Sequence, residues 1–222
     1  MRYFQEEFKE FFNQLSINNN KEWFHANKTE YETHVKIPFE KFVNQLIIQI
    51  SKHEDLKGIT AKQCIGRIHK DIRFSKDKTP YNTHINAFIS PAGSKDKSIP
   101  GLFLRFSPEM IGIMCGAYCP SKQQTERIRK HIANNLSKFE SLHSQKKFYY
   151  TFGEIKGETI KRIPEQWKEV CKLEKLILNK QWYFVAEREP EIFENENLIE
   201  EIMNYYIVAK PLNDFLKIAI KQ

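Results

Sequence analysis

The sequence predicts an α+β fold, in which a mostly antiparallel sheet from the middle of the chain is covered by N- and C-terminal helices. Apolar residues recur at helical spacing near both ends of the chain, whereas residues 65–118 and 181–187 largely alternate between apolar and polar. Pro and Gly separate the alternating runs, and short gaps of this kind favour antiparallel hairpins. No internal repeat or low-complexity linker interrupts the chain, so we expect a single domain over residues 1–222.

Three helices are expected in the first 50 residues. The apolar face of the first consists of Phe4, Phe8, Phe11, Phe12 and Leu15. Residues 18–20 are all Asn and should end this helix, with Asn20 capping a second helix that runs through Trp23 to Tyr31. Pro38 then opens a third helix, whose apolar face extends from Phe39 to Ile50.

Five strands are expected in the middle and late parts of the chain, at residues 65–74, 84–90, 102–107, 110–118 and 181–187. In the third of these, Leu102, Leu104 and Phe106 fall on one face. Only residues 107–109 separate the third strand from the fourth, which indicates a hairpin.

Helices should also cover the sheet from the C-terminal side. Ser121 is a good N-cap for a basic helix over residues 121–131, and a further helical stretch is expected at residues 138–150. Residues 212–220 carry the apolar face of a closing helix, in which Pro211 should mark a kink or a fresh start.

Composition narrows the class of protein. The chain has 41% hydrophobic and 28% charged residues, typical of a globular protein, and no apolar run approaches the roughly 20 residues of a membrane span. The N-terminus reads as an amphipathic helix, so we expect a cytoplasmic protein with no membrane partner. The four cysteines (Cys64, Cys115, Cys119 and Cys171) should be reduced thiols, and no second ligand pair completes a metal site.

Residues 67–83, RIHKDIRFSKDKTPYNT, are the most informative stretch for function. If the stretch begins as a strand, alternate side chains share one face. That face carries Arg67, His69, Asp71 and Arg73. The following turn can fold Asp77, Lys78 and Tyr81 over the same face, and Tyr118 and Arg127 are expected to join if the fourth strand and the basic helix pack alongside.

Two interpretations of this polar face remain open. Arginine offers a planar fork of donors suited to phosphate or carboxylate, and Lys78 adds a point charge, so the face can form a concave anion site. Alternatively, the face is a stabilising network in which Asp71 pairs with Arg67 or Arg73 and Asp77 closes a turn.

Three blocks of the sequence resemble a bacterial family known as domain of unknown function 2461. They are residues 18–32, residues 67–83, and the strand ending at residues 116–120 together with the helix that carries Arg127; residues 160–164 add a weaker match. The resemblance implies a compact α+β domain. It implies no activity, because none is established for the family, and it leaves open whether the protein is an enzyme and whether it uses a cofactor.

Three functions are therefore weighed. The first is a small-molecule site for an anionic ligand, with or without catalytic turnover. The second is a nucleic-acid-binding module that uses the basic helix and exposed aromatic residues, consistent with a net charge of +7 and expected to bind weakly and without sequence preference. The third is a non-catalytic interaction domain. The sequence contains no Walker phosphate loop, zinc-protease motif or serine-hydrolase elbow, and it does not indicate an oligomeric state.

Overall fold

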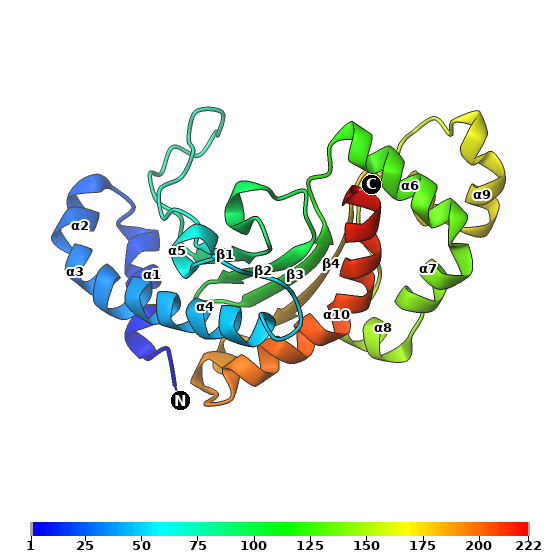
Figure 1. Ribbon diagram of the computed structural model, residues 1–222. Coiled ribbons are helices and arrows are strands. Elements are labelled where there is room, and N and C mark those ends of the chain that lie inside the picture. The colour runs from blue at the N-terminus through cyan, green and yellow to red at the C-terminus, as the bar shows by residue number, and fades with distance from the viewer. Residues whose placement is uncertain (1, 222) are drawn as a thin grey trace.

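The computed structural model describes residues 2–221 and confirms the α+β class, with one four-stranded sheet and helices on either side of it in sequence (Figure 1). The strands are β1 (Ile85–Ile89), β2 (Gly101–Phe106), β3 (Ile111–Ala117) and β4 (Trp182–Arg188). They lie side by side in sequence order, and every neighbouring pair is antiparallel. Four of the five expected strands therefore form, each close to its predicted bounds.

The helices before the sheet are α1 (Glu6–Ile17), α2 (Lys21–Ala26), α3 (Lys28–Glu30), α4 (Ile37–Ile50) and α5 (Ala61–Cys64), with a π-helical turn at Tyr31–Lys36 between α3 and α4. The later helices are α6 (Lys122–Asn134), α7 (Leu136–His143), α8 (Lys146–Phe152), α9 (Lys168–Leu173) and α10 (Leu198–Lys221). Asn20 accepts a hydrogen bond from the N–H of Trp23, and Ser121 forms a capping box with Gln124, so both predicted N-caps are confirmed.

The two faces of the sheet have different surroundings. Helices α4 and α10 lie next to each other across one face (Figure 1), where alternate strand residues such as Leu104 and Ile113 are fully buried. Phe106 anchors this core at a cluster of aromatic rings, with Phe39 at 5.3 Å and Phe42 at 5.4 Å between centroids. The other face, called the open face below, carries the intervening residues of each strand. They form the cross-strand rows Phe88–Phe103–Met114–Val185 and Asn86–Arg105–Gly112–Glu187.

Two polar contacts fasten α10 inside the core. The buried Asn213 side chain accepts a hydrogen bond from the N–H of Gly116 (2.9 Å) and donates one to the carbonyl of Gly101 (3.4 Å). Gly116 has φ of +100°, and a Cβ there would lie 2.2 Å from the carbonyl oxygen of Trp182, so only glycine fits. One turn further along α10, Lys217 forms an ion pair with Glu54, which also accepts a hydrogen bond from Tyr206.

The expected strand at residues 65–74 is wrong. The segment pairs with β1 only at Ile65 and then folds back, so that His69 lies opposite Tyr81 in an isolated bridge. Beyond it the charged side chains bond to one another and to their own loop backbone, which competes with a sheet ladder. Strand pairing therefore does not hold alternate side chains of this segment on one face, as period-two alternation predicted.

One helix prediction needs a smaller correction, because the stretch at residues 138–150 is two helices, α7 and α8, separated at Ser144 and Gln145. Helix α10 continues through Pro211 and bends along its length (Figure 1), which agrees with the predicted kink and not with a fresh start. All four cysteines carry free thiols, and burial raises the pKa of Cys64 to about 11. Between residues 2 and 221 no helix has the length and apolar character to cross a membrane.

Candidate functional site

Residues 67–81 form a loop that projects away from the sheet at the upper left of Figure 1, and we call it the projecting loop. Lys70 bonds Asp77 (2.5 Å), and Asp77 accepts a hydrogen bond from the N–H of Thr79 (2.9 Å). Asp71 receives two hydrogen bonds from the guanidinium of Arg73, at 2.9 and 2.6 Å, which lower the pKa of that carboxyl to about 2. The hydrogen bond from Lys70 likewise holds the pKa of Asp77 well below its usual range. These pairs are those of the stabilising-network interpretation.

The base of the projecting loop is packed into the protein. Tyr81 is buried and stacks on Phe24 with 4.1 Å between ring centroids, and His69 lies 5.0 Å from Tyr81. The side chain of Asn19 bonds both the N–H and the carbonyl of Tyr81. Two of the blocks that carry the family resemblance thus meet here, and the contacts between them hold the base of the loop in place.

The other predicted site residues are dispersed. Lys78 donates to the carbonyl of Ile72 within the projecting loop (2.9 Å). Tyr118 packs edge-on against Tyr183, and Arg127 reaches the carbonyl of Ile220. The structure therefore does not gather the predicted residues around one cavity, and of the arginines in the loop only Arg67 lines a hollow with other cations.

That hollow, called the basic hollow below, has a volume of about 420 Å³ and lies between α5, the start of the projecting loop, β1 and residues 94–97. Four cationic side chains line it, from Lys62, Arg67, Lys95 and Lys97, and no Asp or Glu does. None of the four cations has an ion-pair partner within residues 2–221. The basic hollow is thus a local excess of positive charge.

Neighbouring backbone contacts position these cations. Gly66 donates to the carbonyl of Asn86 (2.8 Å), and a Cβ at Gly66 would lie 2.1 Å from the side-chain oxygen of Asn86. A glycine here lets the chain lie against β1 and places Arg67 at the hollow. On the opposite side, Ser94 donates to the carbonyl of Gln63 (2.7 Å), which ties the lysine-bearing segment to α5. Phe88 and Phe103 add aromatic rings to the lining.

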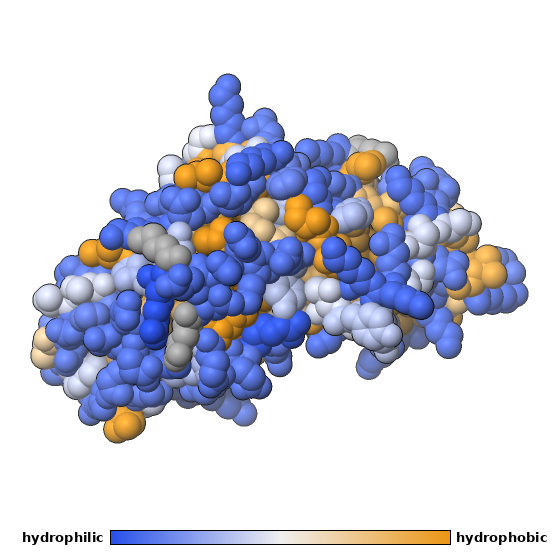
Figure 2. Space-filling model, turned by 90° about the horizontal axis from the view of Figure 1, so that it is seen from below, coloured by the Kyte–Doolittle hydropathy of each residue, from blue (hydrophilic) through white to orange (hydrophobic). Residues whose placement is uncertain are grey.

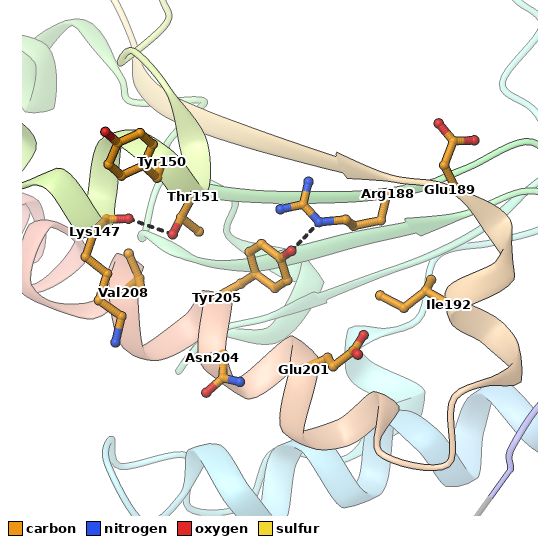
Figure 3. A pocket seen from close by; sticks show the side chains of 10 residues that line it. All are labelled: Lys147, Tyr150, Thr151, Arg188, Glu189, Ile192, Glu201, Asn204, Tyr205 and Val208. Carbon is orange, nitrogen blue, oxygen red and sulfur yellow. Dashed lines mark hydrogen bonds between the residues drawn. The ribbon is translucent and has the colours of Figure 1, made fainter.

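A second hollow of about 800 Å³ lies between α8, the end of β4 and α10 (Figure 3). Its ten lining residues are those labelled in Figure 3, and Lys147 and Arg188 are balanced there by Glu189 and Glu201. Arg188 donates a hydrogen bond to the hydroxyl of Tyr205 and lies 5.0 Å from its ring. Because its charges are balanced, this mixed-charge hollow is less suited to an anion than the basic hollow.

Seen from below, the protein surface is mostly hydrophilic, with small separate hydrophobic patches (Figure 2).

Lys62, Lys95 and Lys97 were missed by the sequence interpretation. The available signal was the cluster of charges in residues 95–97, which lies between Pro91 and Pro100. Nothing in the sequence indicated that this cluster folds next to Arg67. Among the described residues, no group of three or more His, Cys, Asp or Glu side chains is arranged to hold a metal ion.

His84 lies between the projecting loop and the open face, and its titration gives a testable result. Burial, with Arg105 and Lys70 nearby, lowers the pKa of His84 to about 4, and Glu109 opposes the shift. In the unfolded chain the pKa is near 6.5, so the unfolded state binds more protons between pH 6.5 and 4. Stability should therefore fall as pH drops through this window.

The free energy of unfolding should fall less between pH 7 and pH 5 in His84→Gln than in the parent protein. We expect the difference to be about 1 kcal/mol, after allowance for solvent screening. Urea unfolding at both pH values measures the difference. His25→Gln, at an exposed position on α2, is the control and should keep the parent's pH dependence. An unchanged pH dependence in His84→Gln would contradict the expectation.

Comparison with known proteins gives one match. A family model described as a conserved hypothetical protein (DUF2461) matches residues 7–215. No curated protein and no solved structure matches the chain.

Proposed function

Because the chain belongs to the conserved hypothetical protein family DUF2461, whose description names no activity, we propose a function from geometry: the basic hollow binds a phosphate-bearing small molecule. The observation that carries the proposal is the convergence of four unpaired cations on one concave site. Cations of like sign repel one another, and a bound anion relieves that repulsion.

The chemistry of the lining favours phosphate over a single carboxylate. Arg67 can offer two parallel N–H donors to phosphate oxygens, and the three lysines can satisfy the remaining charge. Phe88 and Phe103 provide an aromatic surface beside the cations, which suits a ligand with a planar ring. A nucleotide has both properties.

The basic helix α6, by contrast, is a weaker candidate for an anion site. Arg129 is buried and donates to the backbone carbonyls of Ile177 (3.0 Å) and Asn179 (2.9 Å). Arg127 reaches the carbonyl of Ile220 at the end of α10. Both guanidinium groups are therefore occupied by contacts between α6 and its neighbours.

Anion binding can be tested by calorimetry and thermal unfolding with pyrophosphate and ATP as probes. We expect both probes to bind and to raise the melting temperature. Arg67→Gln should weaken their binding about tenfold, because a charge-assisted hydrogen bond contributes about 1.5–3 kcal/mol. The Lys95→Gln/Lys97→Gln double variant should weaken it further.

Arg73→Gln is the matched control. Arg73 lies in the same loop but is exposed and paired with Asp71, so its replacement should leave probe binding unchanged. If Arg73→Gln abolishes binding while Arg67→Gln does not, the anion binds on the projecting loop and the proposal for the basic hollow fails. The proposal also fails if neither probe binds the parent protein.

A further inference from the structure

The open face of the sheet extends the basic hollow across all four strands. Phe103 on β2 lines the hollow and stands in register with Met114 on β3, which is in turn opposite Val185 on β4. All three side chains are partly exposed. Towards the far edge, Tyr183 and Tyr118 meet edge to face at 5.1 Å, and Tyr118 is 45% exposed. An apolar and aromatic strip therefore begins at the four cations and crosses the sheet.

Gly112, in the adjacent row of the open face, is a glycine that the fold does not require. Added Cβ atoms at the strand residues Gly101 and Gly116 would clash with backbone at 2.4 and 2.2 Å, but at Gly112 the nearest atom is 3.7 Å away. Its φ is not positive. Glycine within a strand costs about 0.5–1 kcal/mol relative to alanine, so a glycine without a structural reason indicates that something approaches the backbone closely.

The side chains beside Gly112 can hydrogen-bond a ligand. Arg105 is opposite Gly112 on β2 and Glu187 is opposite it on β4, and both side chains are exposed. Arg105 thus places a hydrogen-bond donor on one side of Gly112, and Glu187 places an acceptor on the other. Because Gly112 has no side chain, the backbone between them is accessible. A planar ring that lies on Gly112 can therefore form hydrogen bonds at its edges with Arg105 and Glu187.

From these features, and resting on the anion binding of the proposed function, we propose that the basic hollow and the open face together bind a single-stranded nucleic acid more tightly than the hollow alone binds a small phosphate compound. Its phosphates bind in the basic hollow, and its bases lie on the open face against Phe103 and Met114 and over the neighbouring Gly112. Exposed aromatic side chains on a sheet stack unpaired bases, and a four-stranded sheet accommodates two or three of them. A duplex hides its base faces, so it can contact the cations but not the strip.

The test measures binding of fluorescein-labelled dT12 by anisotropy, beside a labelled mononucleotide and a labelled 12-base-pair duplex. We expect dT12 to bind at least tenfold more tightly than the mononucleotide and the duplex. With four phosphate contacts the expected slope of log affinity against log salt is about −3, so affinity should fall about 50-fold between 50 and 200 mM salt.

Two variants locate the contact. Gly112→Val should keep or raise the melting temperature and weaken dT12 binding at least tenfold, while pyrophosphate binding stays unchanged. Phe103→Leu should weaken dT12 binding about fivefold or more, because base stacking on an aromatic ring contributes about 1–3 kcal/mol. Phe74→Leu, at the 95% exposed ring on the projecting loop, is the matched control and should have no effect.

The outcomes separate this inference from the proposed function. If pyrophosphate binds but dT12 binds no more tightly than the mononucleotide, the inference is overturned and the anion site stands. The inference is also overturned if the duplex binds as tightly as dT12, or if Gly112→Val folds normally and retains dT12 binding. If no probe binds, both proposals fail together.

Discussion

Replacing Glu54 with glutamine is expected to lower the free energy of unfolding by about 3–5 kcal/mol, because it leaves a buried ammonium without its counter-charge. The side chain of Lys217 is only 9% exposed and that of Glu54 12%. Tyr206 adds a hydrogen bond to the same carboxylate at 3.2 Å. Burial, with Glu54 close by, raises the pKa of Tyr206, so its hydroxyl remains a donor at neutral pH.

The same helix supplies the control for this substitution. Lys210 and Asp214 form an i,i+4 ion pair on α10, with side chains that are 26% and 43% exposed, and Asp214→Asn should cost less than about 1 kcal/mol. The double variant Glu54→Leu/Lys217→Met removes both charges and should recover most of the stability lost by Glu54→Gln. Guanidinium unfolding of the four proteins measures these differences. Equal effects of Glu54→Gln and Asp214→Asn would show that burial of the pair has little energetic weight.

The second large effect is expected at Asn213, where substitution by leucine should cost about 2–4 kcal/mol. Leucine has a similar size but leaves the N–H of Gly116 and the carbonyl of Gly101 without their side-chain partner, and each unsatisfied buried group costs about 1–3 kcal/mol. Gly101 and Gly116 are opposite each other on β2 and β3, so the asparagine amide bonds both central strands of the sheet to α10.

Asn204→Leu is the matched control, since Asn204 is an exposed asparagine on α10, and it should change stability by less than about 0.5 kcal/mol. Hydrogen exchange gives a second, local measurement, because the Gly116 amide should exchange faster in Asn213→Leu than amides elsewhere in β3. A Gly116 amide that keeps its protection would show that water or backbone replaces the lost acceptor.

The sheet was predictable because strand periodicity is a local property. In the run from Leu102 to Phe106 every second residue is apolar and falls on one face, and β2 forms at Gly101–Phe106. Its partner β3 follows a gap too short for a crossover, which settled the antiparallel pairing. The same reasoning failed at residues 65–74, where alternation is present but the charged side chains bond locally, as Asp71 does with the N–H of Arg73 (3.3 Å).

The candidate site was less predictable because its parts come from separate segments of the chain. An anion site that included Arg67 was one of the two interpretations of the sequence, and Arg67 does line the basic hollow. The lysines opposite it are brought there by the hydrogen bond from Ser94 to Gln63, a long-range contact that periodicity cannot indicate. Likewise, the sequence alone does not distinguish Gly112 from the other strand glycines, because the difference is the free space around its Cα.

The strand order has a consequence for how the chain folds. Strands β1, β2 and β3 are joined by short connections, so they can pair early, at a low cost in loop-closure entropy. Residues 118–181 separate β3 from β4, and that pairing closes a long loop containing α6 to α9. We therefore expect the last strand to dock late in folding, followed by α10. Until β4 docks, the backbone N–H and C=O groups at the edge of β3 are unpaired. A strand of a second molecule can pair with this edge during that time, so slow docking of β4 favours aggregation.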